Sequence, residues 1–338
     1  MKRCVCGHPV ARWGLYDVCH TCLQEYLAVL PERPGLPIVE WQRECYEQRQ
    51  VAAQPNTTPA PRVHLLDVPL DAVSLADTLL FMRECVKRKD AHQIVTINVD
   101  LIRITEEHEH FRTIVNTAAL SVADGKPLLW AARWTKQHLP ARITGTDLVL
   151  GAAQQAHEHG ETMFFLGAAP GVAAKAAAAV QKRFAGVHIA HYSPPMGAFS
   201  DADNRHIVEL IRASGAKYLF VALGSPRGQV WLDEHLHELD VPVCAEIGGV
   251  LNFLAGTVKR APQWVQNSGL EWAYRIAQEP RRLWRRYIVH DLPVFARMLR
   301  RPAATVVNSM DPMPTPPVPL AHERDVPVAL LEQAVGGS

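Results

Sequence analysis

Short apolar runs alternate with longer segments of helical periodicity between about residues 63 and 300. The apolar runs are rich in β-branched and aromatic side chains, as expected for strands, and turn residues follow most of them. We expect strands at 94–98, 120–123, 162–166, 187–191, 218–223 and 243–247, and helices near 105–118, 127–138, 146–159, 171–184, 201–214 and 227–238. This alternation predicts an α/β fold: a Rossmann-like open parallel sheet with helices on both faces.

Shifts in composition divide the chain outside this pattern. Prolines, threonines and alanines without apolar periodicity indicate a linker, and prolines return near the C-terminus, where we expect a tail without stable structure. The sequence therefore predicts five parts: a Cys-rich module (1–50), a linker (51–62), an α/β domain (63–265), a basic helical appendage (266–301) and a Pro-rich tail (302–338).

Composition and charge narrow the classes of function. The chain has 338 residues, of which 48% are hydrophobic, so a disordered or fibrous protein is excluded. Its net charge of +1 does not suit generic nucleic-acid binding, yet the segment from Arg275 to Arg301 holds eight arginines against Glu279 and Asp291. No apolar run approaches the roughly 20 residues of a membrane span, and no signal peptide is apparent. We expect a cytoplasmic protein, with the basic segment available to a membrane surface.

Four cysteines lie close together in the first 22 residues: Cys4, Cys6, Cys19 and Cys22. In a reducing compartment such a cluster indicates a metal site rather than disulfides, and tetrahedral zinc is the usual partner of four thiolates. A free-thiol loop and an iron–sulfur site are the alternatives. Residues 1–50 hold six basic and six acidic side chains, so this module offers no basic face to nucleic acid.

Polar residues stand at the ends of the expected strands, where parallel α/β sheets bind ligands. Asp124 follows one strand and precedes Gly125, so it is a candidate general base or sugar ligand, or else the N-cap of the next helix. Thr96 and Asn98 alternate on one face at the end of another strand. Buried polar groups at that place need partners, and a substrate hydroxyl or amide would serve.

Glycine-rich loops follow three further strands. The loop from Gly167 to Gly171 opens a helix and could receive a phosphate, although a tight turn needs the same glycines and is the stronger interpretation of this loop alone. Gly224, Ser225 and Arg227 place a glycine, a hydroxyl and a cation at a strand end, which suits a diphosphate. The dinucleotide fingerprint is absent from the sequence, which argues against a nicotinamide-dependent oxidoreductase.

The order of these landmarks resembles one known family. They are Thr96-x-Asn98, Ala123-Asp124-Gly125 followed by PLLWAARW, RITGTD, LGAAPGVAAKAA, LGSPR, GGVLNFLAGTVKRAPQW and GLEWAYRIAQEPRRLWRRY. In this order and spacing, over about 63–300, they resemble the WecG/TagA/CpsF family, glycosyltransferase family 26. The resemblance implies an inverting transferase that moves a hexose or N-acetylhexosamine, such as N-acetylmannosamine, from a UDP-sugar to a polyprenyl-diphosphate-linked acceptor. It implies no metal cofactor for catalysis.

The resemblance also implies roles for individual residues. Asp124 would be the catalytic base, with Thr96 and Asn98 holding the donor sugar or the reacting groups. The donor and its diphosphate would be bound by Gly167, Gly171, Gly224, Ser225, Arg227, Gly248 and Gly249. The appendage would contact the lipid-linked acceptor and the anionic inner surface of the cytoplasmic membrane through Arg275, Arg281, Arg282, Arg285 and Arg286. The alternative for the appendage is a solvated face whose Trp and Leu side chains pack on the domain.

One departure from the family pattern bears on function. The family continues its LGSPR loop with Gln-Glu, whereas this chain has Gly228 and Gln229. If the family's Gln and Glu contact the donor, that contact is lost or shifted in this chain, which would alter the sugar specificity or weaken the activity. The alternative function is a nucleotide-sugar-binding or zinc-containing interaction protein without turnover. The sequence leaves homo-oligomer formation open.

Overall fold

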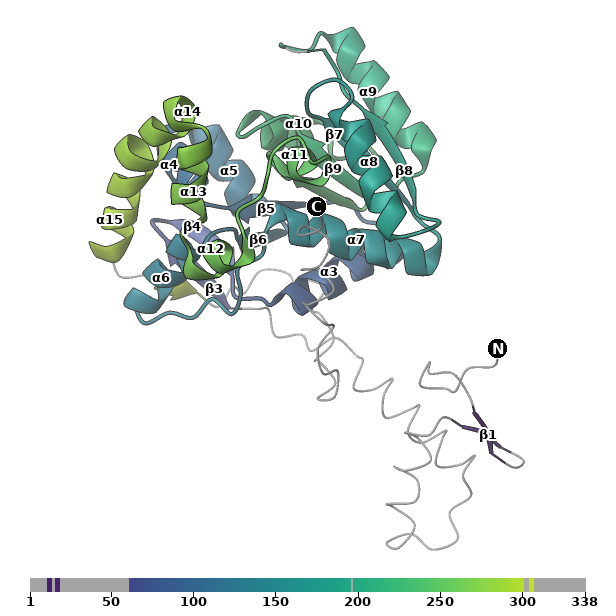
Figure 1. The fold of residues 1–338 in the computed structure, drawn as a ribbon, viewed down its shortest axis with the longest axis horizontal. Helices are drawn as coiled ribbons and strands as arrows, with labels where there is room; N and C mark the ends of the chain where they lie inside the picture. Colours follow the sequence, from purple (N-terminus) through teal and green to yellow (C-terminus); the bar gives the residue numbers. More distant parts are fainter. Residues whose placement is uncertain (1–10, 14–15, 19–60, 196, 301–303, 307–338) are drawn as a thin grey trace, which may run out of the picture. The chain divides into compact units, whose positions relative to one another are not determined.

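The computed structural model describes residues 11–13, 16–18, 61–195, 197–300 and 304–306 (Figure 1). These residues fall into two units. In the first unit, β1 (Ala11–Trp13) and β2 (Tyr16–Val18) form an antiparallel pair. Cys4, Cys6, Cys19 and Cys22 lie outside the described residues, so the zinc site stays a prediction.

A six-stranded parallel sheet forms the centre of the second unit (Figure 1). Its strand order is β6-β5-β10-β9-β7-β8, and every neighbouring pair is parallel. The strands are β5 (His92–Ile97), β6 (Leu120–Ala123), β7 (Thr162–Gly167), β8 (His188–Tyr192), β9 (Tyr218–Ala222) and β10 (Val243–Glu246). All six expected strands are therefore present, with boundaries that differ by at most two residues.

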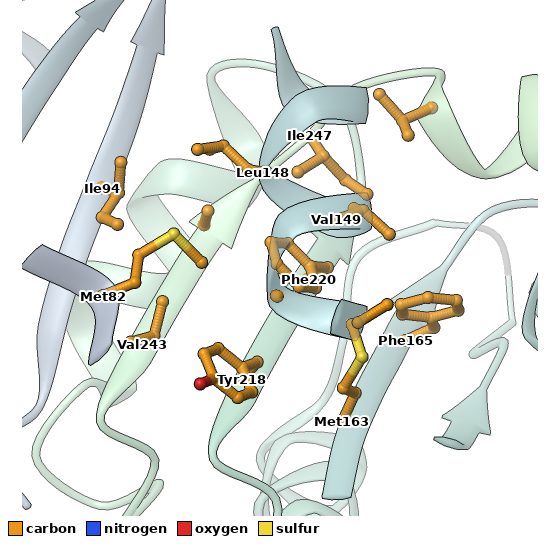
Figure 2. Packing of buried hydrophobic residues seen from close by; sticks show 14 of the residues in the cluster. Met82, Ile94, Leu148, Val149, Met163, Phe165, Tyr218, Phe220, Val243 and Ile247 are labelled. Carbon is orange, nitrogen blue, oxygen red and sulfur yellow. The ribbon is translucent and has the colours of Figure 1, made fainter. Parts of the chain in front are cut away.

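Helices cover both faces of this sheet, which confirms the expected α/β class. Successive residues of a strand point to opposite faces. In β9, Tyr218 and Phe220 therefore join one hydrophobic core, while Leu219 and Val221 join another. Figure 2 shows the first of these cores, in which Met82 from a helix packs with Tyr218 and other strand residues. The helices up to the last strand are α3 (Leu75–Arg88), α4 (Val99–Glu107), α5 (Glu109–Thr117), α6 (Lys126–Trp134), α7 (Gly145–His159), α8 (Val172–Arg183), α9 (Asp201–Ser214) and α10 (Arg227–His235).

The sequence interpretation differs from the structure at the N-terminal side of the domain. A helix was expected near 105–118, but the chain there forms α4 and α5, which meet at His108. The interpretation also contained no element before residue 94, where the structure has α3, β3 (Arg62–Leu65) and β4 (Val68–Asp71). A capping box between Ser74 and Asp77 begins α3, and this local signal would have located the helix.

A second, antiparallel sheet connects the two ends of the unit. Its strand order is β11-β3-β4, where β11 (Ala304–Val306) belongs to the segment that was expected to be an unstructured tail. The remaining tail residues lie outside the described ones. Asp71 in β4 attaches this sheet to the central one, because its carboxylate accepts the backbone N–H of Ser121 in β6 at 2.7 Å and pairs with Arg62 at 2.7 Å.

The chain after β10 is helical, including the Arg-rich appendage, as expected. Its helices are α11 (Val250–Leu254), α12 (Gln263–Ser268), α13 (Glu271–Gln278), α14 (Pro280–Trp284), the π-helix η1 (Arg285–Asp291) and α15 (Leu292–Arg300). The π-helix η1 and α15 pack against α4 (Figure 1), and Arg297 in α15 pairs with Glu106 in α4. Val294 and Met298 are buried in the core beneath α15, so this segment is an integral part of the fold.

Candidate active site

A pocket of about 620 Å³ lies at the carboxyl ends of the central strands. Here β6 lies on one side of β5, and all later strands lie on the other side. Ligands of open α/β sheets bind at such a switch point. Loops after β5, β6, β9 and β10 line the pocket together with the appendage. The polar lining residues include Thr96, Asn98, Asp100, Asp124, Lys126, Arg142, Thr144, Ser225, Glu246, Asn252, Arg260, Glu271, Arg275, Glu279, Arg286 and Asp291.

Asp124 stands directly after β6, and its backbone N–H donates to the carbonyl of Ile97 at 2.6 Å. The following helix begins at Lys126 with Gly125 as its N-cap residue, and no side chain caps it. The capping alternative for Asp124 therefore does not apply in this structure. Its carboxylate receives no hydrogen bond from the residues that the structure describes, and it lines the pocket.

The surroundings of Asp124 change its proton affinity. Burial is the largest cause and raises its pKa to about 7; the positive charges of Arg142 and Arg260 lower it, while Glu271 and Asp147 raise it. A carboxyl group with a pKa near 7 is suited to general-base chemistry at physiological pH, because it is both available and sufficiently basic.

Thr96 and Asn98 both line the pocket, as the sequence predicted, but only Asn98 has a visible structural role. Its side-chain oxygen accepts the backbone N–H of Leu101 at 3.0 Å and so caps α4. Its two amide protons have no partner among the described residues and remain available to a ligand. Thr96 is 7% exposed, and its hydroxyl has no hydrogen-bond partner among the residues that the structure describes.

The predicted donor-binding residues separate into two groups. Gly224, Ser225, Gly248 and Gly249 line the pocket, whereas Gly167, Gly171 and Arg227 are absent from its described lining. Arg227 instead stacks over Phe199, with its guanidinium carbon 4.2 Å from the ring centroid.

Packing explains Gly167. A Cβ atom there would lie 2.6 Å from the carbonyl oxygen of Ala222 in β9, and the residue has a φ of +104°. Glycine is the residue that fits both conditions. The structure therefore favours the turn-and-packing interpretation of this loop over phosphate binding.

Glu246, at the end of β10, was missed by the sequence interpretation. It is 3% exposed and lines the pocket. Burial raises its pKa to about 7, against hydrogen bonds from Gly248, Ser225 and Gly224 that lower it. The available signal was the one that identified Thr96 and Asp124, namely a polar residue that ends a buried strand.

Arg142 and Arg260 also line the pocket. Two of the sequence motifs contain them, but the sequence predicted no role for either. Arg142 contacts Glu271 at 2.9 Å, and Arg260 contacts the other oxygen of Glu271 at 3.8 Å. Glu271 lies in the first turn of α13. The carboxylate of Glu271 thus contacts two arginines from different loops. The charges of these three residues all affect the pKa of Asp124.

The appendage arginines differ in position. Arg275 and Arg286 line the pocket, and Arg286 contacts Asp100 at 3.0 Å. Arg281 and Arg285 are exposed and are absent from the described lining. The side chain of Arg282 lies outside the description. These arginines therefore divide into two that line the pocket and two that are exposed to solvent.

No helix in the described ranges is both long and apolar enough to cross a membrane. Large apolar side chains are nevertheless exposed on α6 and along the appendage: Trp130, Trp134, Trp264, Leu270, Trp284, Ile288, Val289 and Leu292.

Comparison with known proteins agrees with this arrangement. The model of the glycosyl transferase WecG/TagA/CpsF family matches residues 63–306. An N-acetylglucosaminyldiphosphoundecaprenol N-acetyl-beta-D-mannosaminyltransferase of Staphylococcus aureus strain MW2 is 30% identical over 240 residues, which cover 69% of this chain and 90% of the relative. The protein of the same name from strain NCTC 8325 / PS 47 has the same identity and coverage. The chain therefore belongs to the WecG/TagA/CpsF family of glycosyl transferases.

Proposed function

We propose that this chain transfers a hexose or N-acetylhexosamine, such as N-acetylmannosamine, from a UDP-sugar to a polyprenyl-diphosphate-linked acceptor. The reaction inverts the anomeric centre and serves the assembly of a surface polysaccharide or cell-wall polymer. The related S. aureus proteins carry the name of such a transferase, which supports the class of acceptor and of sugar. The proposal depends most on Asp124. Its carboxylate lines the pocket and accepts no hydrogen bond from the described residues.

In the proposed reaction Asp124 accepts the proton of the acceptor hydroxyl. The acceptor oxygen forms a bond to the anomeric carbon while the bond from that carbon to the diphosphate oxygen breaks, and the electron pair leaves with UDP. A single displacement of this kind inverts the anomeric centre. Since the pKa of Asp124 is raised to about 7, the group binds the proton readily and releases it again near neutral pH.

The departing diphosphate gains negative charge and needs positive charge nearby. Arg142, Arg260, Arg275 and Lys126 line the same pocket and supply it, so the proposal uses no catalytic metal. Arg142 and Arg260 are already held by Glu271, so they are oriented before the substrate arrives. We expect turnover to persist after chelation of divalent cations.

Asp124→Asn tests the proposal, because it keeps the shape of the side chain and removes the base. We expect release of UDP in the presence of a short-chain lipid-diphosphate acceptor to fall by about 10²-fold or more, with UDP binding retained. The matched control is Asp201→Asn on the exposed start of α9, which should leave turnover unchanged. Turnover by Asp124→Asn at the wild-type rate would contradict the proposed base.

A second candidate function, nucleotide-sugar binding without turnover, is favoured by Gly228 and Gln229 in place of the family's Gln-Glu. The same assay separates the two. A wild-type protein that binds UDP but releases none from a broad panel of UDP-sugars and acceptors would support the binding function. Turnover that depends on Asp124 would exclude it.

We place the reaction at the inner face of the cytoplasmic membrane, where a lipid-linked acceptor is accessible to a peripheral protein. The exposed residues Arg281, Trp284, Arg285 and Ile288 combine basic and apolar side chains in one segment of the appendage. Such a combination suits an anionic lipid surface, because apolar groups enter the interface while arginines contact headgroups.

A further inference from the structure

A buried carboxyl group that the proposed mechanism does not use lies in the wall of the pocket. One oxygen of Glu246, Oε1, accepts the backbone N–H of Gly224 at 3.1 Å, and the other, Oε2, accepts the hydroxyl of Ser225 at 3.2 Å. The backbone N–H of Gly248 also donates to this carboxylate. Glu246 therefore joins the loop after β9 to the loop after its own strand.

Gln229 completes this arrangement from the first turn of α10. Its Nε2 donates to Ser225 Oγ at 2.9 Å and to Glu246 Oε2 at 3.3 Å. Gln229 is 1% exposed, and its own side-chain oxygen has no hydrogen-bond partner among the described residues. Burial of an unsatisfied oxygen is unfavourable. The amide is thus oriented by its donor end, toward the serine and the carboxylate.

Gly228 leaves the space that Glu246 fills. A Cβ atom at position 228 would lie 2.2 Å from Cγ of Glu246, a distance that requires one of them to move. The two residues at which this loop departs from the family's Gln-Glu are therefore the residue that makes room for Glu246 and the residue that hydrogen-bonds it. Gly228, Gln229 and Glu246 therefore form one interdependent cluster, called the Glu246 cluster below.

The Glu246 cluster changes what the loop after β9 can bind. The N–H of Gly224 and the hydroxyl of Ser225, which the sequence assigned to a diphosphate, already donate to a carboxylate. A diphosphate placed beside that carboxylate would be repelled. The two bonds to Oε2 are longer than usual, 3.2 Å from the hydroxyl of Ser225 and 3.3 Å from the amide of Gln229, so a closer donor from a ligand can replace one of them. A sugar hydroxyl is a neutral donor of the required kind.

We propose that Glu246 is a specificity-determining residue that accepts a hydrogen bond from a sugar hydroxyl of the donor, with Gly228 and Gln229 as the residues that accommodate and orient it. The inference rests on the proposed function, since it takes a UDP-sugar as the donor. The diphosphate then lies toward Arg142, Arg260 and the appendage. The hydroxyl belongs either to the ribose or to the transferred hexose.

Calorimetric titration of the full chain with three ligands tests this contact and identifies its source. The ligands are UDP, 2′,3′-dideoxy-UDP and UDP-N-acetylmannosamine, and the variant is Glu246→Gln, which keeps the shape and removes the charge. If the hexose is contacted, affinity for UDP-N-acetylmannosamine falls about tenfold and affinity for UDP is unchanged. If the ribose is contacted, affinity falls for both and stays the same for the dideoxy ligand.

Two outcomes would overturn the inference: equal affinity of wild type and Glu246→Gln for all three ligands, or tighter binding of UDP by the variant. The latter would place the diphosphate at Glu246. Glu161→Gln is the matched control, because this carboxylate pairs with Arg83 and is absent from the described pocket lining. A wild-type protein that binds none of the ligands would contradict the proposed donor instead.

A second measurement tests the Glu246 cluster without any ligand, and it does not depend on whether Glu246→Gln folds. Thermal unfolding is compared for Gly228→Ala in the wild-type background and in the Glu246→Gly background. We expect Gly228→Ala to lower the melting temperature in the first background and to have little effect in the second, because the clash is gone. The same decrease in both would show that Gly228 does not depend on Glu246.

Discussion

Two carboxyl groups with a raised pKa lie at strand ends of the same pocket, but their surroundings differ. Asp124 receives no hydrogen bond from the described residues, whereas Glu246 accepts bonds from Gly224, Gly248, Ser225 and Gln229. Burial is the main cause of the raised pKa of both. Asp124, which accepts no hydrogen bond from the described residues, is therefore free to exchange a proton. Glu246 is held in a fixed orientation by its donors.

The pH dependence of turnover follows from the pKa of Asp124. The base must be deprotonated to accept the acceptor's proton, so we expect kcat/KM to decrease about tenfold per pH unit below pH 7. Steady-state kinetics between pH 5 and 9 on the free enzyme would measure this limb. An acidic limb centred near pH 4 would contradict the raised pKa.

Stability depends on the same group in the opposite sense. The folded pKa of Asp124, about 7, lies above its ordinary value of 3.8, so the folded state retains a proton that the unfolded chain loses as the pH rises. The free energy of unfolding therefore decreases as the pH rises through this window. We expect Asp124→Asn to be more stable than wild type by about 4 kcal/mol at pH 8 and about equally stable near pH 4.

Urea-induced unfolding at both pH values would measure this difference. Asp201→Asn, at an exposed helix start, should show the same stability difference from wild type at pH 4 and at pH 8. An Asp124→Asn variant that is less stable than wild type at pH 8 would show that the carboxylate stabilises the fold.

At the scale of elements, α4 combines a structural and a functional position in one residue. Asn98 caps the helix with its oxygen and keeps its amide protons free of described partners. Helices positioned by such caps bring pocket residues to defined places: Thr144, the N-cap of α7, also lines the pocket and forms a capping box with Asp147. The start of a helix and the wall of the site are thus the same few residues.

Substitution of Asn98 separates its two roles. Asn98→Asp keeps an acceptor for the N–H of Leu101 and removes the amide protons, so stability should stay within about 0.5 kcal/mol of wild type while donor affinity decreases. Asn98→Ala should lose about 1 kcal/mol of stability as well as affinity. Thermal unfolding and UDP-sugar titration would measure these effects.

Ser200→Ala is the control for Asn98, because it removes the cap of α9, away from the described pocket lining, and should reduce stability alone. Full affinity in Asn98→Asp would assign Asn98 to the helix only.

Sequence periodicity was sufficient for the central parallel sheet, because strands such as β9, buried on both faces, are short apolar runs between turns. The site was predictable where one strand end carries its own polar residue, as at Thr96 and Asp124. Arg142, Arg260 and Glu271 come from distant positions and meet only in the folded chain, so no local pattern indicated their contact. Gly167 lies outside the described pocket lining, and its requirement for glycine arises from the neighbouring strand β9, which no local pattern indicates.

At the scale of the molecule, the appendage is anchored in the domain and also carries exposed basic and apolar residues. Truncation would remove Val294 and Met298 from a core, so point substitutions are the better test of membrane contact. Reversing two exposed charges, Arg281→Glu with Arg285→Glu, should weaken sedimentation with anionic vesicles at least about tenfold, since each cation near such a surface contributes about 1 kcal/mol.

Vesicles of phosphatidylglycerol and phosphatidylcholine, against phosphatidylcholine alone, provide the measurement. The double variant Arg205→Glu with Arg212→Glu, at exposed positions of α9, changes the net charge by the same amount and should leave sedimentation unchanged. Equal loss in both proteins would indicate a general effect of net charge, and unchanged sedimentation of the appendage variant would contradict contact through the appendage.

The N-terminal cysteines make a separate prediction about the whole chain. Four thiolates at Cys4, Cys6, Cys19 and Cys22 should hold about one equivalent of zinc, which elemental analysis of the purified protein would detect. Cys19→Ser with Cys22→Ser should lose it. Less than half an equivalent in the wild type would contradict the zinc site.

The pairing of β11 with β3 places Val306 opposite Arg62. The first and last strands of the family domain are therefore neighbours, although 244 positions of sequence separate these two residues. A short peptide between positions 306 and 62 would close the domain into a ring, which could be reopened at an exposed turn such as Gly186. A circular permutant of this kind should fold and keep its activity. The points at which the domain begins and ends thus lie side by side.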